Sequence, residues 1–292
     1  MIRPVKFGFN EQTAASNSFQ QNVVESDASI IQRQALQEFD DLSNKLKVAG
    51  IDLVVFEDTI SPATPDSIFP NNWISFHESK ELVLYSMLAK NRRLERRDDI
   101  INKFKRQYPT VIDLSQFENM NLFLEGTGSI VFDYGHKTAY ANISPRTNKQ
   151  LFEQLCKQLG YAPVSFYAVD EKGADIYHTN VLMCIGSGFA VICEECIPEQ
   201  GERKTLIDSL KSTGHEIISI SYAQMNSFAG NMYQVFNSKG DSFIVMSEQA
   251  FKSLLPAQIT VLQQYGNLLH SPLYTIEKHG GGSARCMIAE IR

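Results

Sequence analysis

Glu125-Gly126-Thr127-Gly128-Ser129-Ile130-Val131-Phe132-Asp133, the segment EGTGSIVFD, places a polar residue shortly before an apolar run that is typical of a β-strand. The same arrangement recurs along the chain. The polar residues are Asn72, Glu125, His178, Asn231 and Cys286, at intervals of 53, 53, 53 and 55 residues. This regular spacing predicts five copies of one supersecondary unit.

The order of elements within each copy supports the repeat. After Glu125 the sequence predicts strands at 129–133 and 138–143, a helix at 147–159 that Gly160 ends, and a strand at 162–169. The same strand, strand, helix, strand order is predicted for residues 73–114, 180–222 and 232–276. In the last of these, Pro256 interrupts the helix and the final strand covers 272–276.

The fifth copy is divided between the chain ends. Its first strand is predicted at Cys286–Ile291, and the rest at Val5–Phe9, a helix at Ala28–Ala49 and a strand at Asp52–Phe56. Joining the termini in one unit would close a ring and remove exposed strand edges. We therefore expect an α/β fold of five ββαβ modules with pseudo-fivefold symmetry, formed by residues 1–292 as a single catalytic domain.

In such a ring the five polar sites meet at the centre. A carboxylate, an imidazole and a thiol would then share one pocket, which is the composition of a covalent-catalysis site. The segment Gly280-Gly281-Gly282 precedes the thiol of Cys286 and would allow positive φ and close backbone approach to a ligand. The other cysteines lie in apolar runs, where an inert buried thiol is favoured.

Cys193 and Cys196 form a single CxxC pair. A structural zinc site is an alternative interpretation, but it requires four ligands and no second pair or nearby histidine accompanies them. We expect no metal and no organic cofactor, and leave the role of this pair open.

Composition and charge indicate which kinds of partner, such as nucleic acids or membranes, are not expected. The chain has 292 residues, 43% hydrophobic and 21% charged, with a net charge of −6, so a nucleic-acid partner is not expected. The densest basic cluster, which contains Arg92, Arg93, Arg96 and Arg97, is interpreted as a solvated helix face. No apolar run of membrane-spanning length and no secretory signal is present, so we expect no membrane association and a cytoplasmic location. A homo-oligomer remains an open alternative to a monomer.

Four segments resemble the amidinotransferase, arginine deiminase and dimethylarginine hydrolase superfamily, whose members are called penteins. They are LEGTGS at 124–129, NISPRTN at 142–148, HTN at 178–180 and GGGSARCM at 280–287. Within the superfamily the chain is most similar to citrulline-utilisation hydrolases, through FPNNW at 69–73 and FAGNM at 228–232. The resemblance implies a five-bladed α/β propeller.

The resemblance also implies roles for individual residues. Cys286 matches the nucleophile, His178 the general acid/base and Glu125 the active-site glutamate, while Arg146 matches a residue that contacts the substrate α-carboxylate. For Arg146 the alternative is a surface ion pair at a helix start, and for Glu125 a turn residue facing solvent. Asn231 shares the repeat position, so we expect a role in the pocket, although a turn before a strand also favours Asn.

The departures from the superfamily concern charge. Arginine deiminases carry aspartates at the positions of Asn72 and Asn180, and these pair with the cationic guanidinium of the substrate. Two amides cannot neutralise a buried cation, but they can donate to a carbonyl oxygen and accept from an NH2 group. We therefore predict a hydrolase that acts on the neutral ureido group of citrulline through a carbamoyl group on Cys286, releasing ornithine, carbon dioxide and ammonia.

Two other functions remain open at this point. One is an enzyme that acts on a guanidine by deimination, dialkylamine release or amidino transfer. The other is a non-catalytic pentein module that binds a partner, because a shared fold does not settle function.

Overall fold

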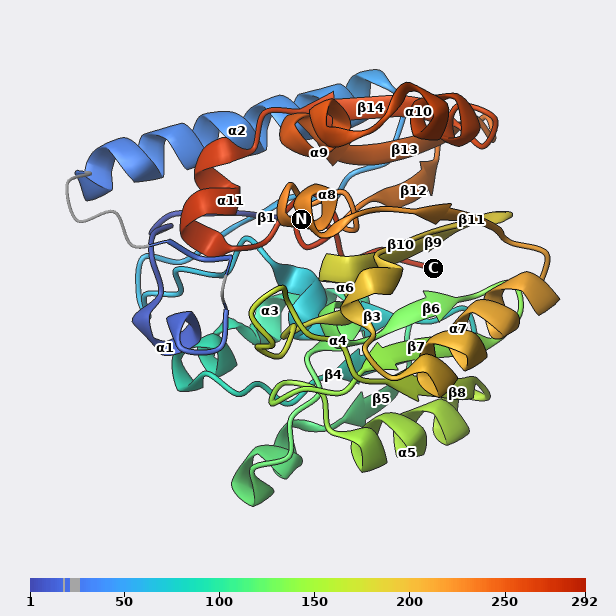
Figure 1. Ribbon diagram of the computed structural model, residues 1–292. Helices are drawn as coiled ribbons and strands as arrows, with labels where there is room; N and C mark the ends of the chain where they lie inside the picture. The colour runs from blue at the N-terminus through green and yellow to red at the C-terminus, as the bar shows by residue number, and fades with distance from the viewer. Residues whose placement is uncertain (18, 22–26) are drawn as a thin grey trace.

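The computed structural model describes residues 1–17, 19–21 and 27–292. It contains five small β-sheets with helices packed around them (Figure 1). Four sheets have three strands, in which an antiparallel hairpin is extended by a parallel third strand. Their strands are β3 Ile74–Phe76, β4 Glu81–Leu84 and β5 Thr110–Asp113; β6 Val131–Asp133, β7 Thr138–Asn142 and β8 Ala162–Phe166; β9 Met183–Gly186, β10 Phe189–Ile192 and β11 Glu216–Ser219; β12 Tyr233–Phe236, β13 Ser242–Ser247 and β14 Asn267–Ser271. The predicted α/β class of repeated small sheets is confirmed.

Helices join the second and third strands of each module. They are α3 Asp98–Phe104, α5 Lys149–Leu159, α7 Gln200–Ser212, and the pair α9 Glu248–Ser253 and α10 Pro256–Leu262. In α5 the Asn148 side chain accepts a hydrogen bond from the backbone N–H of Leu151, and Gly160, with φ of 74°, ends the helix as predicted. Pro256 begins α10, which is separate from α9, so the predicted interruption of the helix at this proline is confirmed.

Short helical turns that include or directly follow the polar repeat residues lead into the first strands. They are the 3₁₀ turn η1 Pro70–Asn72, α4 Gly126–Ser129 and α6 Thr179–Leu182. Strands predicted to start at Ser129 and Asn180 therefore begin later, at Val131 and Met183. Glu125 and His178 are the N-cap residues of α4 and α6, and α4 contacts both η1 and α6. These turns bring polar residues from three modules together.

The fifth module differs from its prediction. Its sheet contains the parallel pair β1 Ile2–Arg3 and β2 Phe56–Glu57, and residues 5–9 are not a strand. The predicted strand Cys286–Ile291 is also wrong. Backbone N–H groups of Cys286, Met287 and Ile288 donate to the carbonyls three residues earlier, which produces helical turns where an extended strand was expected.

Both termini nevertheless share one core. Met1, Met287 and Ile288 are buried in one cluster with apolar residues of helix α2 Ala28–Val48. Met1 and Ile291 line the same small cavity, and α2 packs along β14, as Figure 1 shows, and against α11 Tyr274–Gly280. The ring is therefore closed by side-chain packing, and the C-terminal segment adds no strand.

The last strand of the fourth module lies earlier in the chain than predicted. β14 covers Asn267–Ser271, paired in parallel with β13, while residues 274–280 form α11. Pro272 follows β14 directly and has no N–H to donate to a sheet, which accounts for the end of the strand before the predicted range. The remaining helical elements are α1 Glu11–Ala14, α8 Tyr222–Asn226, η2 Lys90–Glu95, η3 Ser115–Met120 and η4 Glu194–Cys196.

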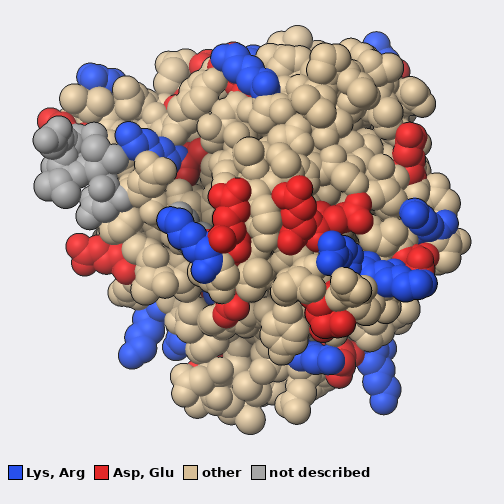
Figure 2. All heavy atoms as spheres, viewed as in Figure 1, with Lys and Arg blue, Asp and Glu red and all other residues tan. Residues whose placement is uncertain are grey.

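The surface carries charges of both signs. On the face shown in Figure 2, acidic side chains gather near the middle, and Lys and Arg are scattered around them with no continuous basic stripe. Of the helices in the described part of the chain, none combines the length and apolar character needed to cross a membrane.

Candidate active site

A narrow buried cavity lies where the polar ends of the modules meet. Its lining includes Asn72, Arg146, His178 and Cys286, together with the glycines at 280–282. Glu125 contacts His178 and Arg146 from behind this lining, and Asn180 and Asn231 contact the sulfur of Cys286. All seven residues singled out from the sequence are therefore in one cluster, and each is at most 4% exposed.

His178 and Glu125 form a buried pair, with 2.9 Å between His178 Nε2 and Glu125 Oε2. Burial opposes ionisation of Glu125, but the Arg146 cation and the hydrogen bond from His178 outweigh it and lower the pKa of Glu125 to about 2. Burial lowers the pKa of His178 to about 4, although the carboxylate favours the imidazolium. At neutral pH the ring is thus neutral, and its proton lies on Nε2, because ionised Glu125 can only accept.

The second ring nitrogen of His178 faces a glycine. A Cβ atom at Gly128 would lie 2.6 Å from His178 Nδ1 and 2.4 Å from Asn72 Nδ2, so a side chain there would displace both groups. The unprotonated Nδ1 is left as the proton acceptor of the ring, and His178 is one of the residues that line the cavity. This glycine therefore permits the close approach of an imidazole nitrogen and an amide nitrogen to the same point.

Cys286 is held by amides on two modules. The Nδ2 groups of Asn180 and Asn231 each lie 3.4 Å from its Sγ atom, and Asn231 Oδ1 accepts from the backbone N–H of Arg285. The glycines before it are needed for space: a Cβ at Gly282 would lie 3.3 Å from Cys286 Cβ, and Gly281 has φ of +65° with Asn17 beside it. The sulfur is therefore positioned in the cavity by rigid neighbours.

Three buried polar atoms near the cavity have no hydrogen-bond partner within the described residues. They are Asn72 Nδ2, Asn180 Oδ1 and Asp66 Oδ1. Buried donors and acceptors are normally paired, so these three atoms are available to bind a substrate or water. The set offers one donor and two acceptors.

Asp66, Arg92 and Glu95 belong to the site but were missed or misread from the sequence. Arg92 is 3% exposed, so its interpretation as part of a solvated helix face is wrong. Its guanidinium makes two hydrogen bonds of 2.9 Å to Glu95, donates to Asn72 Oδ1 at 2.8 Å and lies 3.8 Å from Asp66. The spacing of Arg92 and Glu95, three residues apart, was the available signal for an ion pair on one turn.

Arg146 is buried and is already bound by the N-terminal segment. Its guanidinium donates to the Thr13 carbonyl at 3.0 Å and to Ser16 Oγ at 2.7 and 3.0 Å, and lies over the ring of Tyr177. The alternatives of a surface ion pair for Arg146 and a solvent-facing turn for Glu125 are thus excluded, since the two side chains are 2% and 0% exposed. Its Nε and Nη2 groups are thus occupied, so a substrate carboxylate could bind both of them only by replacing Thr13 and Ser16.

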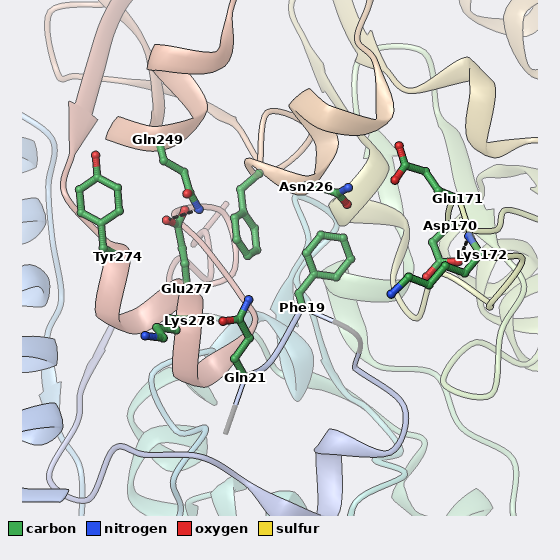
Figure 3. Close-up of a pocket in the computed structure, with 11 residues that line it drawn as sticks. Phe19, Gln21, Asp170, Glu171, Lys172, Asn226, Gln249, Tyr274, Glu277 and Lys278 are labelled. Carbon is green, nitrogen blue, oxygen red and sulfur yellow. Dashed lines mark hydrogen bonds between the residues drawn. The ribbon is translucent and has the colours of Figure 1, made fainter. Parts of the chain in front are cut away.

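Residues of the same N-terminal segment line both cavities: Asn17 the buried one, and Phe19 and Gln21 a larger outer one. Phe19 packs against Tyr177 and Phe228, and Gln20 Nε2 donates to the His279 carbonyl at 2.8 Å. The outer cavity, of about 480 Å³, is shown in Figure 3, with Phe19 and Gln21 on one side and Asp170, Glu171 and Lys172 on another.

Glu277 connects the outer cavity to the segment that carries Cys286. It accepts from Gln249 Nε2 at 2.8 Å, the contact drawn in Figure 3, and from Ser283 Oγ at 2.6 Å. Burial raises the pKa of Glu277 to about 8. The carbonyl of Ser283 in turn accepts from the backbone N–H of Cys286 at 3.0 Å, so Glu277 helps to fix the turn that carries the thiol.

Cys193 and Cys196 are fully buried in another core, with their sulfurs 2.9 Å apart and Met225 Sδ 3.3 Å from Cys196. Among the described residues, no third metal-binding side chain is grouped with them. The structural zinc alternative for this pair therefore has no support.

The chain is similar to known proteins over its whole length. A family model described as "N,N dimethylarginine dimethylhydrolase, eukaryotic" matches residues 3–292. No curated protein sequence matches the chain. A solved structure of the N-terminal domain of ArgZ, covalently bonded to a reaction intermediate, superposes with a TM-score of 0.78 and 19% identity, over 100% of this chain and 96% of that chain.

Two further structures extend the comparison. Full-length ArgZ, described as an arginine dihydrolase from the ornithine-ammonia cycle in cyanobacteria, gives a TM-score of 0.77 at 19% identity and matches 100% of this chain but 40% of that one. A dimethylarginine dimethylaminohydrolase adduct with S-methyl-L-thiocitrulline gives 0.66 at 14% identity, over 98% and 96% of the two chains. At these identities the likeness shows a shared fold, and this chain spans less than half of full-length ArgZ.

Proposed function

Because the chain belongs to the eukaryotic N,N-dimethylarginine dimethylhydrolase family of pentein hydrolases, we propose that it hydrolyses a C–N bond of a linear amino acid whose side chain ends in a ureido group, as in citrulline. The proposal rests on the family membership and on the groups that surround Cys286. It assigns residues 1–292 to one catalytic domain.

The proposal of a ureido substrate rests on two amide atoms that have no hydrogen-bond partner among the described residues. Asn72 Nδ2 can donate to the ureido oxygen, and Asn180 Oδ1 can accept from the terminal NH2 group. Both atoms are buried, so leaving them unpaired is unfavourable by about 1–3 kcal/mol each. A ureido group supplies one acceptor and one NH2 group and would satisfy both.

The first chemical step is attack of the Cys286 sulfur on the ureido carbon. The thiol proton passes to Nδ1 of His178, the S–C bond forms, and Asn72 stabilises the charge that develops on the ureido oxygen. The imidazolium then gives its proton to the substrate Nδ as the C–Nδ bond breaks. Ornithine leaves, and Cys286 carries a carbamoyl group.

Water completes the reaction in a second step. Neutral His178 accepts a proton from the water as it adds to the thiocarbamoyl carbon, and the C–S bond breaks to release carbamate and restore the thiol. Carbamate decays to carbon dioxide and ammonia. Glu125 holds the Nε2 proton throughout and so leaves Nδ1 as the proton acceptor of the ring.

The lowered pKa of His178 predicts the acid side of the pH profile. The ring acts as a base only when neutral, so protonation abolishes turnover; with a pKa of about 4, kcat/KM should stay level from about pH 6.5 to 5 and fall tenfold per unit below about pH 4. The measurement is kcat/KM against pH, with tryptophan fluorescence to confirm that the protein is folded. An acid limb centred near the ordinary value of 6.5 would contradict this role.

A guanidino substrate is the second candidate, favoured by Asp66. Its Oδ1 atom is buried without a partner among the described residues, and a carboxylate next to the cavity suits a cationic group. Asp66 weakens the expectation of an uncharged pocket, although burial raises the pKa of its carboxyl group. With arginine, loss of ammonia would give citrulline, which the ureido reaction would convert to ornithine, as the description of ArgZ as an arginine dihydrolase suggests.

A comparison of citrulline, arginine and dimethylarginine with identification of all products tests these proposals. We expect ornithine and ammonia from citrulline, and lower citrulline turnover, by about tenfold or more, in the variant Asn72→Asp/Asn180→Asp, whose carboxylates replace the amide donors. Asn267→Asp, at an exposed position on β14, is the matched control and should be unchanged. Product from arginine or dimethylarginine with none from citrulline would reject the ureido proposal, and no turnover of any substrate would favour a binding module.

A further inference from the structure

A second group of chemically active side chains lies outside the cavity, at the junction of two modules. Asp133 ends β6, His136 is in the hairpin turn between β6 and β7, and His215 lies between α7 and β11. The three side chains each offer one ligand atom, and these atoms all lie within 4.8 Å of one another. None of these residues lines the cavity of Cys286.

The distances are those of a compact ligand set. His136 Nδ1 lies 3.0 Å and His215 Nε2 3.6 Å from Asp133 Oδ2. Around a tetrahedral zinc ion with bonds of about 2.0–2.1 Å, neighbouring ligand atoms are about 3.3–3.5 Å apart. Small adjustments of the side chains would therefore place all three atoms on one ion.

His215 is already oriented as a ligand. Its other nitrogen, Nδ1, lies 2.8 Å from Thr213 Oγ1 and 3.3 Å from the Leu210 carbonyl. Donation from Nδ1 to these oxygens leaves the lone pair of Nε2 facing Asp133. Histidines that bind metals are typically fixed in this way by a hydrogen bond from the second ring nitrogen.

The charge of Asp133 also favours a bound cation. Its carboxylate is 5% exposed, and among the described residues its ion-pair partners are His136 and His215, with no Lys or Arg. A bound cation would supply, next to this buried carboxylate, the positive charge that no Lys or Arg among the described residues provides. The side chain of His136 is 46% exposed, so water can complete the coordination.

We propose that Asp133, His136 and His215 bind a divalent first-row transition metal ion, with Zn²⁺ as the best fit. Two imidazoles and one carboxylate are the ligand types that this ion prefers, and three protein ligands leave a position for water. The ion would link the β6–β7 hairpin of one module to the α7–β11 connection of the next. It takes no part in the reaction at Cys286.

Titration of the full chain with Co²⁺ and Zn²⁺ tests the site. The Cys286→Ser variant serves as the background, because it removes the thiol of the other histidine-containing cluster. We expect saturable binding of one Co²⁺ with visible d–d bands and no thiolate charge-transfer band, and displacement by Zn²⁺. Zn²⁺ should also raise the unfolding temperature.

Substitution of His136, the exposed member of the three proposed ligands, tests whether the metal binds at this site. His136→Ala, which removes little packing, should weaken Co²⁺ and Zn²⁺ binding by about tenfold or more and abolish the rise in unfolding temperature. His270→Ala, at a histidine on β14, should leave both unchanged. Absence of saturable binding, a thiolate band in the cobalt spectrum, or equal affinity in His136→Ala would each overturn the proposal.

Discussion

Replacing Cys286 by serine is expected to reduce kcat for the amino-acid substrate by on the order of 10³-fold or more, as for other nucleophiles that form a covalent intermediate. The serine side chain is close in size to the cysteine that it replaces and could still accept from the Asn180 and Asn231 amides. A serine hydroxyl gives up its proton far less readily than a thiol, however, and His178, whose pKa is lowered to about 4, is a weak base. Steady-state turnover with mass spectrometry of the intact protein measures the effect.

Mass spectrometry separates a chemical defect from a structural one. Wild-type protein quenched during turnover should carry a carbamoyl adduct on Cys286, and Cys286→Ser should carry none. Cys184→Ser is the matched control, because Cys184, on strand β9, is a free thiol that is similarly buried. Retention of roughly a tenth or more of wild-type kcat in Cys286→Ser would show that His178 and Glu125 activate water directly, without a covalent step.

The ring and its centre could be predicted from the sequence because local signals agreed with the spacing. Asn148 and Gly160 delimit α5, and Gly214, with φ of 80°, follows α7. The intervals between Asn72, Glu125 and His178 repeat because each residue follows the last strand of one module and precedes the first strand of the next. The regular spacing therefore predicted the order of the modules correctly, even where the predicted strand boundaries were wrong.

The remaining features depend on contacts between distant segments. The apolar run after Cys286 has the composition of a strand, but in the structure it turns, and Met287 packs against the core that includes α2. Arg92 has the sequence context of a surface helix, and its burial follows from contacts with Asp66 and Asn72, 26 and 20 residues earlier. No local pattern in a single sequence reports such pairings.

The largest effect on stability is expected at Arg92. Arg92→Met should lower the free energy of unfolding by about 3–5 kcal/mol, because it leaves the buried carboxyl groups of Glu95 and Asp66 without their cation. Arg93→Met is the matched control: Arg93 is 23% exposed and pairs with Glu118 at 3.4 Å, so its loss should be worth about 1 kcal/mol or less. Urea unfolding monitored by circular dichroism gives both values.

The pH dependence of unfolding and a double variant show whether an unpaired buried charge or lost packing causes the loss of stability in Arg92→Met. Burial raises the pKa of Glu95 to about 7 even beside Arg92, so this carboxyl group binds its proton more tightly when folded than when unfolded, where its pKa is about 4.5. Its stabilising contribution is complete below about pH 4.5 and is lost as pH rises through about 7, and removal of Arg92 raises the folded pKa further. The loss in Arg92→Met should therefore be greater at about pH 8 than at about pH 5. Arg92→Met/Glu95→Met should recover part of it, and equal losses in the single and double variants would show that packing, not an unpaired charge, is responsible.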